Sequence, residues 1–197
     1  TTLFRSNEID FKHDTGLISA DNFITAKIAI KTIANLNGLY ASFLPKPLKN
    51  ESGSGFHINL SIAKDGKNLF KTDNEHSQEA ESFIAGILDR LKEITAILNP
   101  TVNSYKRFGS HEAPKYVTWS HKNRSQLIRI PASTGEYNRM ELRSADCTCN
   151  PYLAFTVLLQ AGMEGIREKK VLPKATDVNL YKLDEKELEK YEKLPEN

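Results

Sequence analysis

The chain has 197 residues, of which 39% are hydrophobic, enough to bury one sizeable core. Its 27 Lys and Arg residues nearly balance its 25 Asp and Glu residues, giving a formal net charge of +2, so the total charge indicates no nucleic-acid partner. Charged residues interrupt the apolar stretches before the roughly 18 residues of a membrane span, and the first residues lack the apolar core of a signal peptide. We therefore expect a cytoplasmic protein without membrane contact.

The first two predicted elements are a helix and a strand. The apolar spacing in residues 18–37 predicts a packed amphipathic helix, which Asp21 could cap at its start and Gly38 at its end. In residues 56–62 apolar and polar residues alternate, which predicts a strand with one apolar and one polar face. The polar positions of this strand are His57, Asn59 and Ser61.

The middle of the chain predicts a second helix and three more strands. A clean apolar stripe in residues 78–99 predicts the helix, which Pro100 ends. Residues 115–120 and 127–130 predict two short strands. In residues 137–143 apolar Met140 and Leu142 alternate with charged residues, which predicts a strand with three charged side chains on one face. These are Arg139, Glu141 and Arg143.

The last predicted elements are helical. Asn150 before Pro151 predicts the start of a third helix, which Gly162 and Gly165 weaken near its end. The charged run in residues 184–194 predicts a solvated terminal helix. Runs of strands bounded by separate helices indicate the α+β class. We expect an antiparallel sheet with a polar active-site face and with helices packed on its other side.

The two cysteines, Cys147 and Cys149, are separated by one residue. This spacing fits neither a disulfide framework nor paired C-x-x-C zinc ligands. A lone close pair also supplies too few ligands for zinc. We therefore expect two free thiols.

Basic residues outnumber acidic ones by eight to three between residues 106 and 143. Five of the eight are arginines, whose planar guanidinium matches carboxylate and phosphate oxygens in pairs. Composition alone is equally typical of a basic surface that binds nothing, or that binds nucleic acid loosely. The shared face of Arg139, Glu141 and Arg143 favours a bound metal or anion, because adjacent like-facing charges are costly without one. His57 beside Glu141 would form a corner of a divalent-metal site.

A series of short motifs then resembles the glutamine synthetase family. Lys46-Pro47, the Gly53-Ser54-Gly55 loop, His57 and Ser61 are similar to the ATP-region signature of that family. The other similar blocks keep the family's order: NEIDF (7–11), NPTVNSYKR (99–107), EAP (112–114), NRS (123–125), IRIP (128–131), RMELR (139–143) and NPYLA (150–154). Because chance explains that order poorly, the resemblance extends over nearly the whole chain.

This resemblance implies an ATP-dependent ligase. In the family, ATP phosphorylates the γ-carboxylate of glutamate, and ammonia then displaces phosphate from γ-glutamyl phosphate, giving glutamine, ADP and phosphate. The implied partners are glutamate, ammonia and ATP as cosubstrate, and the implied cofactor is Mg²⁺ or Mn²⁺. The resemblance also implies a homo-oligomeric ring in which neighbouring subunits share active sites.

By match to the motifs, the resemblance implies a role for each of twelve residues. The metal ligands would be Glu8, His57 and Glu141. The glutamate-binding residues would be Arg107, Arg143 and Gly53. The ATP-binding residues would be Ser61, Asn59, Arg129 and Arg139. Arg124 would stabilise the transferred phosphoryl group, and Glu112 would close a flap over the site and help to receive ammonium.

The sequence also departs from the family pattern. Ser52 stands where the family usually has asparagine, Asn59 stands where histidine is common, and the segment from Arg107 to Glu112 is one residue shorter than in many members. A smaller N-terminal domain and acidic strands should precede residue 1, and helical sequence should continue beyond residue 197. We therefore expect an inactive fragment, with a partial catalytic domain in residues 1–175 and a charged segment in residues 176–197 that starts a truncated helical region.

Two alternative functions remain open at this point. A γ-glutamyl-amine ligase of the same family would carry the same ATP and metal apparatus. A non-catalytic binding module is the alternative from another class. Tyr181 resembles a tyrosine that some bacterial members adenylylate, and we predict no such modification here, because Lys182 and the acidic run after it differ from the regulated pattern.

Overall fold

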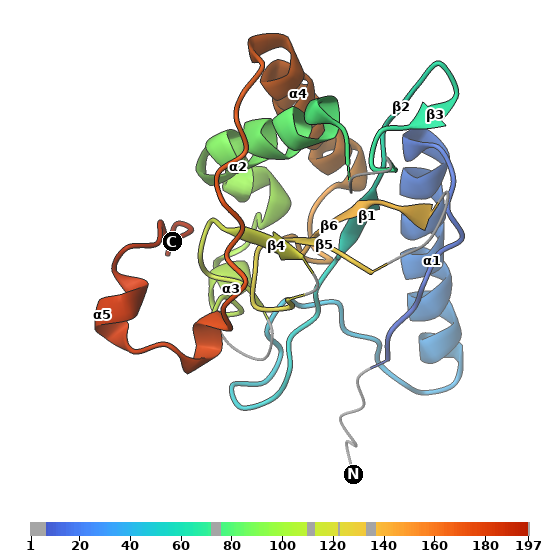
Figure 1. Cartoon of the computed structure of the whole chain (residues 1–197). Helices are drawn as coiled ribbons and strands as arrows, with labels where there is room; N and C mark the ends of the chain where they lie inside the picture. Colours follow the sequence, from blue (N-terminus) through green and yellow to red (C-terminus); the bar gives the residue numbers. More distant parts are fainter. Residues whose placement is uncertain (1–6, 72–75, 110–112, 122, 133–136, 197) are drawn as a thin grey trace.

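The computed structural model describes residues 7–71, 76–109, 113–121, 123–132 and 137–196. Figure 1 shows a small sheet at the centre, with α2 and α4 stacked on it and α1 beside it. The described elements, in chain order, are α1 (Gly16–Leu36), β1 (Ile58–Leu60), β2 (Ala63–Lys64), β3 (Lys67–Asn68), α2 (Gln78–Leu98), α3 (Val102–Tyr105), β4 (Trp119–His121), β5 (Ile128–Ile130), β6 (Met140–Leu142), α4 (Pro151–Glu168), the 3₁₀ helix η2 (Leu180–Lys182) and α5 (Glu185–Leu188).

The central sheet has the strand order β1-β6-β5-β4 and two distinct faces. Pairing register aligns one apolar row across all four strands: Ile58, Leu142, Ile128 and Trp119. This row belongs to the buried core that α2 and α4 complete. The next row lies on the opposite face because side chains alternate along each strand: Asn59, Glu141, Arg129 and Ser120. The predicted α+β class and the two-faced strands are confirmed.

One strand pair differs from the predicted antiparallel arrangement, because β4 and β5 run parallel. Parallel neighbours usually need a crossover of a dozen or more residues. Here each strand has only three residues, so the chain must return over only about 10 Å. The described residues 123–127 of the connection alone are long enough for that distance.

α2 and α4 lie side by side on the sheet and approach each other closely. A Cβ atom at Gly165 would lie 2.1 Å from the backbone oxygen of Ser82 and 2.7 Å from Cα of Gly86. A Cβ atom at Gly162 would lie 2.2 Å from the ring of Phe83. The helix runs through both of its glycines to Glu168, so they serve close helix packing where the sequence suggested only a weakened helix end.

α1 begins earlier and packs less than predicted. Its N-cap is Thr15 rather than Asp21, and Gly38 follows its end with φ +68°, as expected for a glycine at this position. Only Ala20 and Phe23 are buried. Several of its apolar residues are exposed: Leu17, Ile18, Ile28, Ile33 and Leu36. The prediction of a packed helix is therefore wrong for most of its apolar surface.

The charged tail is also different from its prediction. Only Glu185–Leu188 is helical there, and Leu194 is buried. The tail runs back along the segment before β4, where Val117 N donates to Glu192 O and Leu194 N donates to Lys115 O, both at 2.8 Å. The predicted solvated helix over residues 184–194 is therefore wrong, because pairing and apolar burial hold the tail against the fold. A domain boundary at residue 175 stays a prediction.

Both cysteines are free, as predicted, and the fold buries them. Burial raises the pKa of Cys147 to about 11 and that of Cys149 to about 12, so both thiols stay protonated at neutral pH. Among the helices of the described residues, none combines the length and apolar character that a bilayer span requires.

Candidate active site

Glu141 lies at the centre of the polar row. Its strand, β6, has β1 on one side and β5 on the other, so basic groups approach its carboxylate from several directions. Arg129 Nε lies 2.6 Å and Arg143 Nη1 lies 3.1 Å from Oε2. His57 Nδ1 lies 3.4 Å from Oε1. The structure thus brings together one buried carboxylate, one imidazole and two guanidinium groups.

The surroundings of Glu141 keep it ionised. Burial alone would raise the pKa of this carboxyl group. The hydrogen bond with His57 and the charges of Arg143 and Arg129 outweigh burial and lower the pKa to about 2. At neutral pH the group is therefore a carboxylate, the form that can ligate a hard cation.

The Arg143 side chain has one N–H donor for which the described residues provide no acceptor. The side chain is 3% exposed and its Nη1 group faces Glu141. Its Nε is buried without a hydrogen-bond partner in the described part of the chain. Because a buried donor without an acceptor is costly, this geometry is typical of an arginine that an anionic ligand would satisfy.

Arg107 lies against the backbone that follows β6. Its Nη1 donates to Ser144 O at 2.8 Å and its Nη2 donates to Arg143 O at 3.1 Å. Burial lowers the pKa of the Arg107 guanidinium, and the negative charge of Asp146 opposes that shift. The two arginines expected to bind glutamate are therefore connected, since one donates to the main chain of the other.

The glycine loop before β1 passes close to Arg107. A Cβ atom on Gly55 would lie 2.5 Å from Arg107 Nη2. A Cβ atom on Gly53 would lie 2.2 Å from Pro45 O and 3.2 Å from Arg107 Cγ. Gly53 therefore needs glycine because a Cβ there would meet backbone, whereas a Cβ on Gly55 would displace the Arg107 guanidinium. Gly53 also lies beside a residue expected to share its ligand.

The residues expected to bind ATP lie on β1, β5 and β6 or next to them. Arg139 Nε donates to Asn59 Oδ1 at 2.8 Å, and Arg139 Nη1 donates to Tyr137 O at 3.0 Å. Arg129 is in the same row as Asn59, on the other side of Glu141. Ser61 follows β1 and is half-buried. Three of these four residues are therefore close neighbours across the sheet.

Two other expected residues, Glu8 and Arg124, are not part of this cluster. Glu8 is exposed before α1, and Arg124 is exposed in the loop between β4 and β5. Glu112 lies outside the described residues. In the described ranges, His, Cys, Asp and Glu side chains form no group of three that could hold a metal. His57 and Glu141 are therefore the only two of the expected metal ligands that the structure brings together.

Two buried polar residues behind the arginines were missed in the sequence. Asn99 and Asp146 are both 0% exposed, and Asn99 Nδ2 donates to Ser144 O and to Asp146 Oδ2. Asn99 belongs to one of the motif blocks, which is a signal that could have pointed to it. Nothing in the spacing around Asp146 sets it apart from a surface acid.

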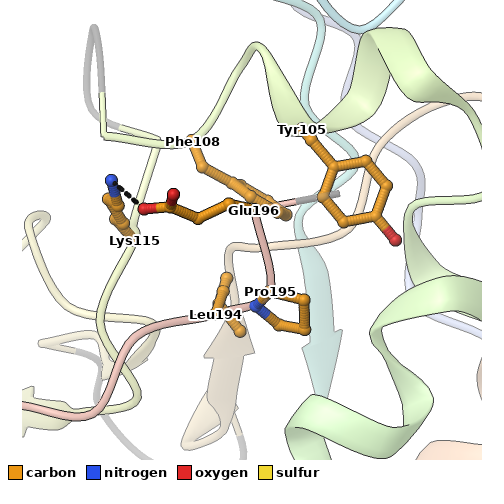
Figure 2. Close-up of a pocket in the computed structure, with 6 residues that line it drawn as sticks. All are labelled: Tyr105, Phe108, Lys115, Leu194, Pro195 and Glu196. Carbon is orange, nitrogen blue, oxygen red and sulfur yellow. Dashed lines mark ion pairs between the residues drawn. The ribbon is translucent and has the colours of Figure 1, made fainter.

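Two cavities lie away from the polar row. One, of about 230 Å³, is lined by Tyr105, Phe108 and the end of the tail, with Lys115 Nζ 2.9 Å from Glu196 Oε1 (Figure 2). The other, of about 220 Å³, lies beside Tyr181. Among the expected site residues that the structure describes, none lines either cavity, so the candidate site is the polar face around Glu141.

The chain belongs to the glutamine synthetase family, since residues 5–197 match the family model described as glutamine synthetase, catalytic domain. The glutamine synthetase of Methanosarcina mazei is 50% identical over 187 residues, which cover 93% of this chain and 42% of the relative. That of Pyrococcus horikoshii is 46% identical over 195 residues, covering 97% of this chain and 44% of the relative. The chain thus spans less than half the length of these relatives.

Solved structures give the same family and fold. A structure named GmaS/ADP complex superposes with a TM-score of 0.85 at 34% identity, covering 95% of this chain and 44% of the other. A cryo-EM structure of Plasmodium falciparum glutamine synthetase superposes with a TM-score of 0.73 at 34% identity, covering 79% of this chain and 31% of the other.

Proposed function

We propose that this chain forms part of an enzyme that joins ammonia to the γ-carboxylate of glutamate. ATP first phosphorylates that carboxylate, and ammonia then displaces phosphate, giving glutamine, ADP and phosphate. The observation that carries the proposal is the buried, ionised Glu141 with His57 at one oxygen and two arginines at the other. Phosphoryl transfer needs such a concentration of fixed charge more than it needs a covalent catalyst.

His57 and Glu141 fit two ligands of a divalent cation. An imidazole and an ionised carboxylate suit Mg²⁺ or, with the nitrogen ligand, Mn²⁺. Such an ion would neutralise phosphate charge when bound. We propose that Glu8 serves a second ion, and that further ligands come from segments that the relatives possess outside the matched region.

Arginines in and beside the polar row are proposed to hold the nucleotide and the transferred group. Arg129 and Arg139 would contact the nucleotide, with Asn59 and Ser61 beside them. The similar GmaS structure is a complex with ADP, which supports adenine-nucleotide binding by this fold. Arg124 would approach the transferred phosphoryl group from its loop.

The glutamate end of the site is proposed to lie around Arg143. Its buried Nε lacks an acceptor in the described part of the chain, and a substrate carboxylate would supply one. Arg107 and the backbone at Gly53 would complete this contact. Glu112 is proposed to close over the site and to help receive ammonium.

The decisive experiment uses the full-length enzyme, meaning a protein in which this sequence is joined to the segments that its relatives have outside the match. Purified full-length enzyme should form glutamine and release phosphate when ATP, glutamate, ammonium and Mg²⁺ are all present. Omission of any one should stop phosphate release. The isolated chain should bind nucleotide weakly and show negligible turnover; no glutamine from the full-length enzyme would contradict the proposal.

The same assay separates the alternatives. Methylamine or ethylamine replaces ammonium in parallel reactions, and a higher kcat/KM with an alkylamine would favour a γ-glutamyl-amine ligase. Nucleotide binding without phosphate release by any amine would favour a non-catalytic module. The proposal further includes a cytoplasmic location and a homo-oligomeric ring with shared active sites. Mass photometry of the full-length enzyme would test the oligomeric state.

A further inference from the structure

Asp146 and Asn99 form a buried polar pair behind the two arginines assigned to glutamate. Asn99 Nδ2 donates to Asp146 Oδ2 at 3.0 Å. The other carboxylate oxygen, Oδ1, accepts from Thr148 N at 2.9 Å and from Thr148 Oγ1 at 2.5 Å. Both members of the pair are 0% exposed. Burying a carboxylate costs free energy unless hydrogen bonds and opposite charge compensate for the lost hydration. A buried Asp146 is therefore evidence for a specific role.

The pair fixes the backbone that holds Arg107. Ser144 O accepts from Asn99 Nδ2 and from Arg107 Nη1, both at 2.8 Å, which uses both lone pairs of the carbonyl. Arg107 Nη2 donates to the preceding carbonyl, that of Arg143. The Ser144 carbonyl thus lies between Asn99 of the buried pair on one side and the Arg107 guanidinium on the other.

The charge of Asp146 also acts on Arg107. Burial lowers the pKa of that guanidinium, and Asp146 is the largest opposing influence. Opposite charge in a low-dielectric surrounding is felt over several ångströms. The carboxylate therefore stabilises a buried cation as well as the backbone that the cation contacts.

We infer that Asp146, together with Asn99, is a positioning residue for glutamate: it holds residues 143–146 so that Arg107 and Arg143 face the carboxylate end of the substrate. This inference rests on the proposed function. Asp146 itself is enclosed by protein atoms, so its effect must pass through the residues that it positions, chiefly Arg107. Its loss should weaken glutamate binding and spare the nucleotide, which we assign to the other end of the row.

The first test is Asp146→Asn in the full-length enzyme, because this change removes the charge and nearly keeps the shape. We expect the glutamate KM to rise about tenfold or more while the ATP KM stays within about twofold. Asp89→Asn is the matched control, since Asp89 pairs with Lys170 on the surface of α2, and neither KM should change. Equal shifts of both KM values, or no shift in the glutamate KM, would overturn the inference.

A double-mutant cycle adds a readout that a purely structural role would not move. If Asp146 acts through Arg107, then Asp146→Asn should raise the glutamate KM little further in an Arg107→Lys background. Additive effects would contradict the inference. Thr148→Val is the milder substitute should Asp146→Asn fail to fold; it should raise the glutamate KM by a smaller factor and leave the ATP KM unchanged, and an unchanged glutamate KM would contradict the inference. A wild-type enzyme that forms no glutamine would instead refute the proposed function itself.

Discussion

Arg139 Nε donates a 2.8 Å hydrogen bond to Oδ1 of Asn59 across the β1–β6 pair. The family resemblance implies a histidine at the position of Asn59. The Asn59 amide oxygen accepts a hydrogen bond from Arg139, and Tyr137 O accepts one from a second nitrogen of the same guanidinium. The departure from the family pattern therefore keeps a polar group that can orient Arg139.

This contact predicts a selective loss of nucleotide affinity in Asn59→Leu. The bond is exposed and a typical hydrogen bond contributes about 1 kcal/mol, so the ATP KM of the full-length enzyme should rise about fivefold or more. Asn59→His should stay within about threefold of wild type, because an imidazole also offers an acceptor. Asn22→Leu on the exposed face of α1 is the control. Unchanged ATP KM in Asn59→Leu would remove Arg139 from the nucleotide site.

Glu141→Ala should abolish glutamine formation in the full-length enzyme. The substitution removes a proposed metal ligand and leaves the facing arginines without their counter-charge. His57→Ala should reduce turnover less completely, because the carboxylate remains. Phosphate release dependent on ATP, glutamate and ammonium is the measurement, with circular dichroism as the check on folding. Near-normal turnover in a folded Glu141→Ala enzyme would exclude its proposed role.

Much of this arrangement could be predicted from alternation along the strands. Because side chains in a strand alternate between faces, the positions of Asn59 and Glu141 in the sequence already set them on a polar face. The short connection between β4 and β5 is typical of an antiparallel pair, so the parallel β4–β5 pair could not be predicted from spacing. The β2–β3 hairpin had a local signal that was overlooked, Asp65-Gly66, whose φ values are +52° and +73°.

The parts of the site that could not be predicted depend on burial. The residues around Asp146 in the sequence do not distinguish it from a surface acid. Only the tertiary fold buries it beside Asn99. The closeness of Gly55 to Arg107 depends in the same way on two segments that are far apart in the chain. For α1, the apolar spacing predicted a helix correctly but not how much of its surface is covered, because spacing carries no information about neighbouring segments.

Close packing of α2 and α4 predicts that Gly165→Ala destabilises the fold. The added Cβ would lie 2.1 Å from Ser82 O and 2.7 Å from Gly86 Cα, both backbone atoms that can move only if the helices separate. Overpacking of this kind costs about 1–3 kcal/mol, and urea unfolding would measure the loss. Gly16→Ala is the control, because a Cβ atom there meets nothing within 4 Å. Equal stability of the two variants would argue against helix contact at Gly165.

The last prediction concerns pH and Glu141. The pKa of its carboxyl group falls from 4.5 to about 2 on folding, so the unfolded chain binds its proton more readily than the folded one. A group with a depressed pKa stabilises the fold above its unfolded pKa, and the stabilisation disappears as pH falls from about 4.5 towards 2. The shift is worth on the order of 3 kcal/mol. Glu141→Gln should therefore lower the free energy of unfolding at pH 7, and urea titrations should show the gap to wild type narrowing steadily between pH 5 and pH 2.5 in the purified protein. A gap of constant size over that range would mean that the arginines and His57 do not hold the pKa of Glu141 down.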